Sequence, residues 1–274
     1  AKELIKKLNK NLGGKFVKFY PGVSYRHLAV LRGDFERTEC IPPHDIIGKK
    51  IEDYLPKREG SEFLKKLMRD SVALLLEHEV NKKRKKPANM IWLWGQGKTP
   101  FMPSYKKKYN LTGSVITAVN LIKGIGRVIG LKVINVPHAT GYYDTNYLGK
   151  ARYALRSLKE RDFVLVHVEA PDEAGHMGEI EEKIKAIENF DKFVVGTILE
   201  GLKKFKKWRI MVLPDHPTPI SVMTHTDEPV PFAIYGGDIK GKGPEGFSER
   251  EISKSKLFLK QGFRLMDLLV KRNP

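Results

Sequence analysis

The sequence contains one cysteine, Cys40, among 274 residues, so an internal disulfide is excluded. A reducing compartment, the cytoplasm, is therefore the simpler expectation. No apolar run approaches the ~20 residues that a membrane-spanning helix needs, and the first 12 residues form a charged amphipathic pattern instead of a secretory hydrophobic segment. With 41% hydrophobic and 30% charged residues, intrinsic disorder is excluded as well.

Acidic residues are few for the number of basic ones. The chain has 32 Asp and Glu against 50 Lys and Arg, which gives a formal net charge of +18. Residues 1–110 hold 25 basic and 12 acidic residues, whereas 111–274 hold 25 and 20. A basic first region suits an anionic ligand, and composition leaves nucleic acid, a membrane surface and a small phosphorylated acid open.

Residues 1–110 have the pattern of a small α+β domain. We expect a helix over 1–12, a hairpin of strands from 15–20 and 27–34, a helix over 61–80 and a short strand over 90–94. The pattern changes after Asn110, and we place the domain boundary between residues 110 and 111.

From residue 111 onward, apolar strands alternate with helical patterns. The expected strands are 114–119, 131–136, 163–170, 208–215 and 229–236, and the expected helices follow 119 and cover 147–160, 179–205 and 253–271. Runs of Val, Ile and Leu separated by helices predict an α/β domain with a mostly parallel sheet flanked by helices. His167, inside one of these strands, is expected to be a packed core residue.

Five potential metal ligands follow these strands: Asp172, His176, Asp215, His216 and His225. Ligands of an open α/β sheet lie beyond the carboxyl ends of its strands, so we expect the five side chains to meet there. A single Asp at a strand end is more often a helix cap, and the prediction therefore depends on all five together. Mixed carboxylate and imidazole ligands suit Mn²⁺, Zn²⁺, Co²⁺ or Fe²⁺ better than Ca²⁺, and the cluster is large enough for two ions.

The segments around these residues resemble one family. EAPDEAGH, VLPDHPTPI and THTDEPVPF are similar to the metal-binding half of the alkaline phosphatase superfamily, and most similar to archaeal-type cofactor-independent (2,3-bisphosphoglycerate-independent) phosphoglycerate mutases. FYPGVSYRHL, PPHDIIGK, PANMIWLWGQG, TAVNLIKGIGR and ATGYYDTNYLGK resemble further segments of that family, so the resemblance covers essentially the whole chain. It implies a substrate-binding insert in 1–110 and an alkaline-phosphatase-like core in 111–274.

The resemblance implies an activity and its cofactors. The activity is the interconversion of 2- and 3-phosphoglycerate, in glycolysis and gluconeogenesis, through a phosphoserine intermediate. Asp172, His176 and His225 would hold one divalent metal ion, and Asp215 with His216 would contribute to a second. Mn²⁺ is the first candidate, Mg²⁺, Zn²⁺ and Co²⁺ are alternatives, and no organic cofactor is expected.

The chain departs from the family at its start. In the family, an Asp ligand and the nucleophilic Ser precede the substrate-binding insert, and this sequence begins inside the insert. The resemblance therefore implies that the first strands of the core, this Asp and the Ser lie upstream of Ala1. No serine of the chain is assigned as the nucleophile.

The resemblance also points to the basic insert for substrate anchoring. Arg26 and His27 are the first candidates, because Arg grips a carboxylate or phosphate with two hydrogen bonds. Gln96, Lys123 and Arg127 are weaker candidates, since a Lys or Arg near a helix start is more often a solvated surface residue.

Two alternatives stay open. One is a metal-dependent phosphohydrolase, or a mutase of another phosphorylated metabolite, because metal ligands alone do not set the substrate. The other is a basic nucleic-acid-binding protein, suggested by the charge and by the runs KKRKK and KKK. These runs lack interleaved aromatics, and Lys-rich surfaces are common in thermophile proteins. We therefore expect a small phosphorylated three-carbon acid as the partner, not nucleic acid or a membrane, and we predict no oligomeric state.

Overall fold

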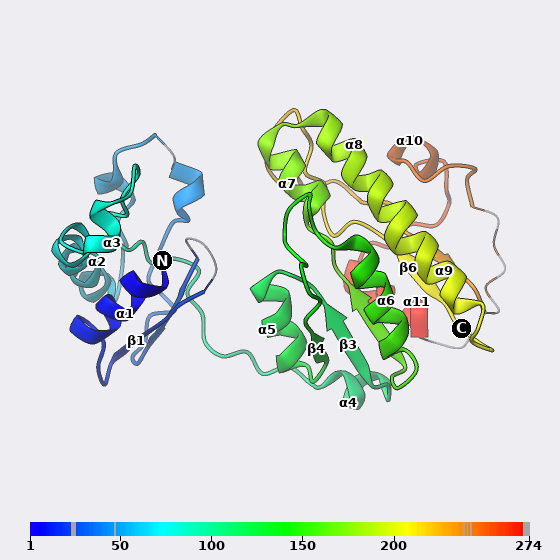
Figure 1. Cartoon of the computed structure of the whole chain (residues 1–274), viewed down its shortest axis with the longest axis horizontal. Coiled ribbons are helices and arrows are strands. Elements are labelled where there is room, and N and C mark those ends of the chain that lie inside the picture. The colour runs from blue at the N-terminus through cyan, green and yellow to red at the C-terminus, as the bar shows by residue number, and fades with distance from the viewer. Residues whose placement is uncertain (23–25, 47, 238, 240, 242, 271–274) are drawn as a thin grey trace. The chain divides into compact units, whose positions relative to one another are not determined.

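The structure is a computed structural model that describes residues 1–22, 26–46, 48–237, 239, 241 and 243–270 (Figure 1). It divides into two compact units, Ala1–Phe101 and Met102–Pro274, which are described separately below. The division precedes the expected boundary by nine residues, because α4 (Tyr105–Tyr109) packs into the second unit. Tyr105 is buried there with Val115 and Leu131.

The first unit packs helices against a hairpin. Its elements are α1 (Lys2–Asn11), β1 (Val17–Tyr20), β2 (Leu28–Leu31), the 3₁₀ turns Pro43–Ile46 and Ile51–Tyr54, α2 (Ser61–Leu76) and α3 (Glu79–Lys82). The strands β1 and β2 pair in antiparallel fashion, as the alternating pattern predicts. Leu8, Phe19 and Leu67 belong to the buried cluster that joins α1, β1 and α2. The α+β character of this region agrees with the expectation.

Two local predictions for the first unit were wrong. The helix expected over 61–80 is interrupted after Leu76, and the strand expected over 90–94 has no strand partner among the described residues. Side chains hold this segment instead, because the Ile91 N–H donates to Ser71 Oγ at 3.0 Å and Trp92 Nε1 donates to the Ile41 carbonyl at 2.7 Å. An apolar run can thus be anchored by buried side chains without a strand ladder.

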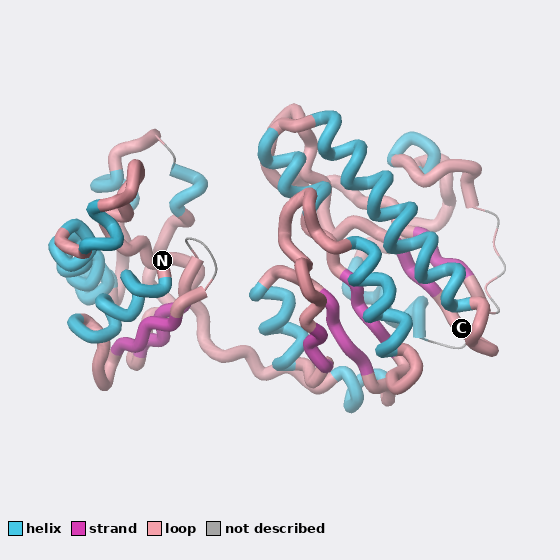
Figure 2. The backbone as a smooth tube through the Cα atoms, viewed as in Figure 1, coloured by secondary structure: helices cyan, strands magenta, loops and turns pink. Residues whose placement is uncertain are grey.

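The second unit contains a parallel sheet. Its elements after α4 are β3 (Gly113–Ile116), α5 (Asn120–Val128), β4 (Lys132–Ile134), α6 (Tyr147–Ser157), β5 (Phe163–Val166), α7 (Ala170–Met177), α8 (Ile180–Asn189), a π-helix (Phe190–Gly196), α9 (Thr197–Leu202), β6 (Ile210–Val212), β7 (Ala233–Tyr235), α10 (Glu249–Ile252), a 3₁₀ turn (Gly262–Arg264) and α11 (Leu265–Val270). The strand order is β4-β3-β5, and both pairings are parallel. Figure 2 shows these strands among the helices of the unit. The predicted α/β class with a parallel sheet flanked by helices is confirmed.

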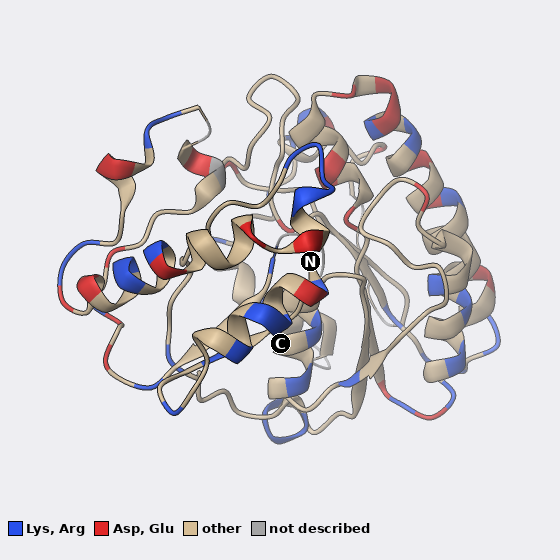
Figure 3. Ribbon diagram, turned by 60° about the vertical axis from the view of Figure 1, so that its left-hand side comes forward, with Lys and Arg blue, Asp and Glu red and all other residues tan. Residues whose placement is uncertain are grey.

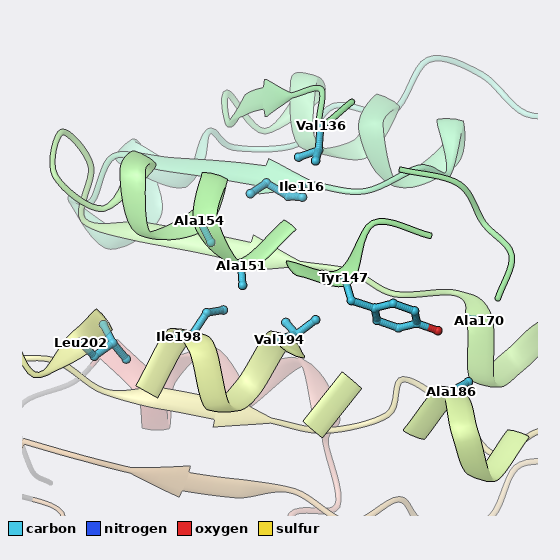
Figure 4. Close-up of a cluster of buried hydrophobic side chains, with 10 residues drawn as sticks. All are labelled: Ile116, Val136, Tyr147, Ala151, Ala154, Ala170, Ala186, Val194, Ile198 and Leu202. Atoms are coloured by element: carbon cyan, nitrogen blue, oxygen red, sulfur yellow. The ribbon is translucent and has the colours of Figure 1, made fainter. Parts of the chain in front are cut away.

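Helices cover both faces of this sheet because successive residues of β3 point in opposite directions. Val115 contacts α5, where a Cβ on Gly126 would lie 2.6 Å from Val115 Cγ1. On the other face, Ile116 packs toward Ala151 and Ala154 of α6, which are both fully buried (Figure 4). Small side chains on α6 let the helix pack between the sheet and the helical segment of the π-helix and α9.

The last strands and helices differ from the prediction. β6 pairs with β7 in antiparallel fashion and forms a sheet separate from β4-β3-β5 in the described part of the chain. The long helix expected over 253–271 was wrong, because within 253–270 only 265–270 is α-helical and residue 271 lies outside the described residues. Leu257 and Phe258, within this range, are 62% and 68% exposed.

Charged side chains of both signs occur together on the helices. Figure 3 shows acidic residues interspersed with basic ones on α1 and α2. Exposed pairs such as Lys66–Asp70 at 2.5 Å follow the helical spacing of three or four residues. Among the described residues, no helix is both long and apolar enough to cross a membrane.

Candidate metal centre

Asp172 and His176 lie on α7, which begins shortly after the end of β5. Pro171 occupies the first turn, where its fixed φ and missing N–H suit a helix start, and Gly178 ends the helix with a φ of 71°. One helical turn separates the two side chains, so they lie on the same face. His176 Nε2 is 3.4 Å from Asp172 Oδ2.

His225 reaches the same place from the loop that follows β6. The loop folds back on itself, with the Thr226 N–H donating to the Pro217 carbonyl at 3.3 Å. His225 Nε2 lies 3.4 Å from Asp172 Oδ1 and 3.0 Å from His176 Nε2. Three of the five ligands predicted from sequence therefore face one another.

Asp215 and His216 follow β6, which ends at Val212, after two intervening residues. The His216 ring lies against His225 with a centroid separation of 3.9 Å and an angle of 39° between the ring planes. Asp215 Oδ2 is 3.5 Å from His216 Nε2. One ligand atom from each of Asp172, His216 and His225 lies within 4.8 Å of the others. The structure thus brings together side chains from the ends of β5 and β6 and from the loop beyond β6.

The hydrogen bonds of the histidines indicate which nitrogens are available. His176 Nδ1 lies 3.0 Å from the Met223 carbonyl, and because a carbonyl only accepts, Nδ1 must carry the hydrogen. Its Nε2 then presents a lone pair toward His225 Nε2, and two such nitrogens at 3.0 Å need a proton or a cation between them. Metal-binding histidines commonly donate their other N–H to a carbonyl in this way. The residues present therefore fit a divalent cation.

Exposure is graded across the cluster. The side chain of Asp172 is 22% exposed and that of His176 33%, whereas His225 is 52% and Asp215 67% exposed. Asp172 is therefore the innermost carboxylate, and the outer residues border solvent. A catalytic metal site requires such access, because a coordination position must stay open for the reacting group.

His167 lies beside this cluster and is not a purely packed core residue as expected. β5 ends at Val166, and His167 Nδ1 is 3.1 Å from Thr117 Oγ1 while Nε2 is 3.3 Å from Glu169 Oε2. Burial lowers the pKa of His167, and the Asp215 carboxylate opposes this effect. The strand prediction over 163–170 was too long by the four residues that turn into α7.

Sequence reasoning missed Lys150. Its side chain is fully buried on α6, and Nζ donates to the His167 carbonyl at 3.1 Å. Burial lowers the pKa of Lys150 to about 8, with the Glu169 carboxylate opposing the shift. A signal was present, because Lys150 shares the helical face of the buried residues Tyr147 and Ala154.

Thr218 and Lys183 were also missed. Thr218 is 5% exposed and lies two residues after His216, so its place in the sequence DHPT was the available signal. Lys183 belongs to the charged pattern of α8, which is typical of a solvated helix, and its contact with the Thr218 carbonyl has no sequence signature.

The substrate candidates of the first unit lie near the hairpin and in the segment 95–97. Arg26 is exposed next to residues 23–25, which lie outside the described part of the chain. His27 Nδ1 accepts the Gly22 N–H at 3.0 Å, and burial lowers the pKa of His27. The Gln96 amide donates to the Thr38 carbonyl. His27 and Gln96 thus both hold nearby backbone.

Lys123 and Arg127 lie in the second unit on α5. The helix follows the carboxyl end of β3, and the Lys123 N–H donates to the Val119 carbonyl in its first turn. Lys123 is half-buried and Arg127 is exposed. α5 thus begins at the same edge of the sheet as the loop between β5 and α7.

Comparisons with known proteins agree with this architecture. A family model described as the metalloenzyme superfamily matches residues 21–272. The chain is 49% identical over 277 residues to a probable 2,3-bisphosphoglycerate-independent phosphoglycerate mutase of Geobacter sulfurreducens, covering 99% of this chain and 69% of that protein. It is 49% identical over 278 residues to a 2,3-bisphosphoglycerate-independent phosphoglycerate mutase of Methanosarcina barkeri, covering 99% of this chain and 70% of that one.

A solved structure shares the fold. It is described as a cofactor-independent phosphoglycerate mutase from Thermoplasma acidophilum, with a TM-score of 0.58 and 23% identity. The match covers 98% of this chain and 68% of that one.

Proposed function

We infer the function of this chain from its family, because it belongs to the metalloenzyme superfamily and, within it, to the 2,3-bisphosphoglycerate-independent phosphoglycerate mutases. Members of this family are metal-dependent isomerases. We propose that the protein interconverts 2-phosphoglycerate and 3-phosphoglycerate. The observation that carries this proposal is the cluster of Asp172, His176, His216 and His225 beyond the strand ends.

We propose that the cluster holds two divalent ions. Asp172, His176 and His225 would hold one ion, and Asp215 with His216 would contribute to the other. The nitrogen and oxygen donors support Mn²⁺ as the first candidate, with Mg²⁺, Zn²⁺ and Co²⁺ as alternatives. When bound, two such ions supply an activated alkoxide and stabilise the charge on a transferred phosphoryl group.

The residues of this chain would act on the substrate by charge and position. Arg26 and His27 are the first candidates for gripping the carboxylate or phosphate, followed by Gln96, Lys123 and Arg127. Phosphoryl transfer depends mainly on positioning and electrostatic stabilisation, so cationic side chains of this kind suit the chemistry. The proposal includes a phosphoserine intermediate, and no serine of this chain is assigned as its nucleophile.

The cellular setting belongs to the same proposal. We propose a role in glycolysis and gluconeogenesis, a cytoplasmic location and a thermophilic source. The single free cysteine supports the location, and the Lys-rich composition supports the source. The expected partner is the small phosphorylated acid, and nucleic acid and membranes are not expected partners. No organic cofactor is expected.

The decisive experiment uses the protein expressed from its whole gene, stripped of metal and supplied with 3-phosphoglycerate. Phosphorus NMR should show 2-phosphoglycerate only after Mn²⁺ is restored. Release of inorganic phosphate without 2-phosphoglycerate would identify a phosphohydrolase instead. Salt-sensitive retention of an oligonucleotide, without turnover of phosphoglycerate, would favour a nucleic-acid-binding protein.

A further inference from the structure

The Thr218 hydroxyl connects two of the proposed ligands. Oγ1 donates to Asp172 Oδ1 at 2.5 Å and lies 3.3 Å from His216 Nδ1. A hydroxyl has one hydrogen, which Asp172 receives, so the contact with His216 requires Nδ1–H of the imidazole to donate. His216 Nε2 then keeps its lone pair. The Pro217 carbonyl, 3.4 Å from His216 Nδ1, calls for the same Nδ1–H. The hydroxyl thus fixes the direction of the Asp172 carboxylate and, together with this carbonyl, favours one tautomer of His216.

The backbone of Thr218 is held from the opposite side. Lys183 of α8 donates its ammonium group to the Thr218 carbonyl. Burial lowers the pKa of Lys183, and the Asp172 carboxylate opposes this effect. The ammonium group is therefore close enough to Asp172 to interact with it electrostatically. The loop after β6 is therefore attached to α8 at the residue whose side chain contacts the ligands.

Gly175 of α7 leaves the room for this attachment. A Cβ at this position would lie 2.5 Å from the Thr218 carbonyl oxygen and 2.9 Å from Lys183 Nζ. Side chains do not approach that closely, so any other residue would push the lysine and the loop away. Glycine also weakens a helix relative to alanine. Its presence in α7, between Asp172 and His176, is explained by the close approach.

We propose that Thr218 is a positioning residue for the metal centre, held in place by Lys183 across Gly175. Thr218 orients Asp172 and, together with the Pro217 carbonyl, favours the His216 tautomer whose Nε2 is available to a cation. This inference rests on the proposed function, because it assumes that the cluster binds divalent metal. Outer hydrogen bonds of this kind commonly change metal affinity by 10- to 100-fold.

The test compares variants of the protein expressed from its whole gene. Thr218→Val keeps the shape and removes the hydroxyl, whereas Thr218→Ser keeps the hydroxyl and removes the methyl group. Isothermal titration calorimetry measures the dissociation constant for Mn²⁺, and circular dichroism measures the melting temperature of the metal-free protein. We expect about 10- to 100-fold weaker binding in Thr218→Val and about wild-type binding in Thr218→Ser.

Ser157→Ala is the matched control for the loss of a buried hydroxyl. Ser157 Oγ is 2.7 Å from Ser114 Oγ in β3, at the start of the strand and away from its carboxyl end. This variant should bind Mn²⁺ as the wild type does. Equal affinity in Thr218→Val and the wild type would overturn the positioning role. Equal weakening in Thr218→Val and Thr218→Ser would also overturn it, because the hydroxyl would then not be the cause.

A second pair of variants tests the attachment itself and serves if Thr218→Val does not fold. Gly175→Ala should weaken Mn²⁺ binding, because the added Cβ displaces Lys183 and the loop. Gly196→Ala is its control, since a Cβ there would lie 3.5 Å from the Asp191 carbonyl oxygen, an ordinary contact. Unchanged affinity in Gly175→Ala would contradict the inference. Failure of the wild type to bind Mn²⁺ would instead remove the proposed function on which the inference rests.

Discussion

Polar side chains have different partners in the two units. In the first unit they hold backbone: Asn81 Nδ2 donates to the Leu75 carbonyl at 2.9 Å and to the Ala88 carbonyl, and the Gln96 amide donates to Thr38. In the second unit, several polar side chains face one another at the strand ends. Backbone contacts use up donors and acceptors, whereas imidazoles and carboxylates that face one another leave lone pairs for a ligand. The difference supports the proposal that the metal centre lies in the second unit.

The charge difference between the units is smaller than the sequence suggested. At the structural boundary, residues 1–101 hold 22 basic and 12 acidic residues, and residues 102–274 hold 28 and 20. Three basic residues changed sides because Lys106, Lys107 and Lys108 lie on α4, which packs in the second unit. The first unit is still the more basic for its size. Its role in anchoring an anion is therefore a weaker prediction than the metal cluster.

The largest expected effect comes from the innermost carboxylate of the cluster. Asp172→Asn, in the protein expressed from its whole gene, should lower the mutase rate by on the order of 10³-fold, because a metal ligand contributes several kcal/mol of transition-state stabilisation. The melting temperature of the metal-free protein should change little. Asp227→Asn, an exposed change in the loop that carries His225, is the control and should keep its activity. Full activity in Asp172→Asn would contradict the assignment of the catalytic metal centre to this cluster of the second unit.

The next effect tests whether the two units unfold independently of each other. Leu8 is 1% exposed in the core of the first unit, so Leu8→Ala should lower the free energy of unfolding by about 2–5 kcal/mol. Urea unfolding, followed by a probe in each unit, measures the change. Leu76→Ala, at a residue 46% exposed, should have a much smaller effect. A changed Mn²⁺ affinity in Leu8→Ala would show that the units are coupled.

A buried lysine makes the stability of the second unit depend on pH. The pKa of Lys150 falls from 10.5 in the unfolded chain to about 8 in the fold, so the unfolded state binds more protons between these pH values. The free energy of unfolding should therefore rise from about pH 8 to pH 10.5, by up to about 3 kcal/mol. Urea unfolding at several pH values should show this rise in the wild type and not in Lys150→Met. The same rise in Lys150→Met would assign it to another group, and Lys159→Met is the exposed control.

The cluster could be predicted from sequence because topology places it. Asp172 follows β5 of the parallel sheet, whose strands end at one edge, so its place could be predicted without exact helix bounds. His216 also follows an apolar strand, as predicted, but β6 pairs with β7 outside that sheet, so the parallel-sheet rule alone does not bring His216 to Asp172. The helix predicted over 253–271 was wrong because a helix also needs a surface to pack against. Its apolar residues Leu257 and Phe258 are exposed, so they gain no packing against another element, and most of the stability of a helix in a protein comes from such packing.

Thr218, Lys183 and Gly175 mark the limit of prediction at the site. Each is ordinary in sequence, and their relation exists only after α7, α8 and the loop beyond β6 have packed. Lys150 was more accessible to reasoning, because its spacing from Tyr147 and Ala154 already placed it on the buried face of α6. Contacts between distant segments depend on how the helices and loops pack. The helical repeat of 3.6 residues, in contrast, is enough to show which residues share one face of a helix.

The smallest of these effects tests whether the first unit anchors the substrate. If Arg26 grips the substrate, Arg26→Met should raise KM by about 10- to 100-fold with little change in kcat, since a hydrogen bond to a charged group contributes about 1.5–3 kcal/mol. Arg32→Met, an exposed change on the same hairpin, is the matched control and should leave KM unchanged. Steady-state kinetics with 3-phosphoglycerate measures both. If Arg127→Met raises KM and Arg26→Met does not, substrate anchoring belongs to the second unit, and the division of labour between the two units is wrong.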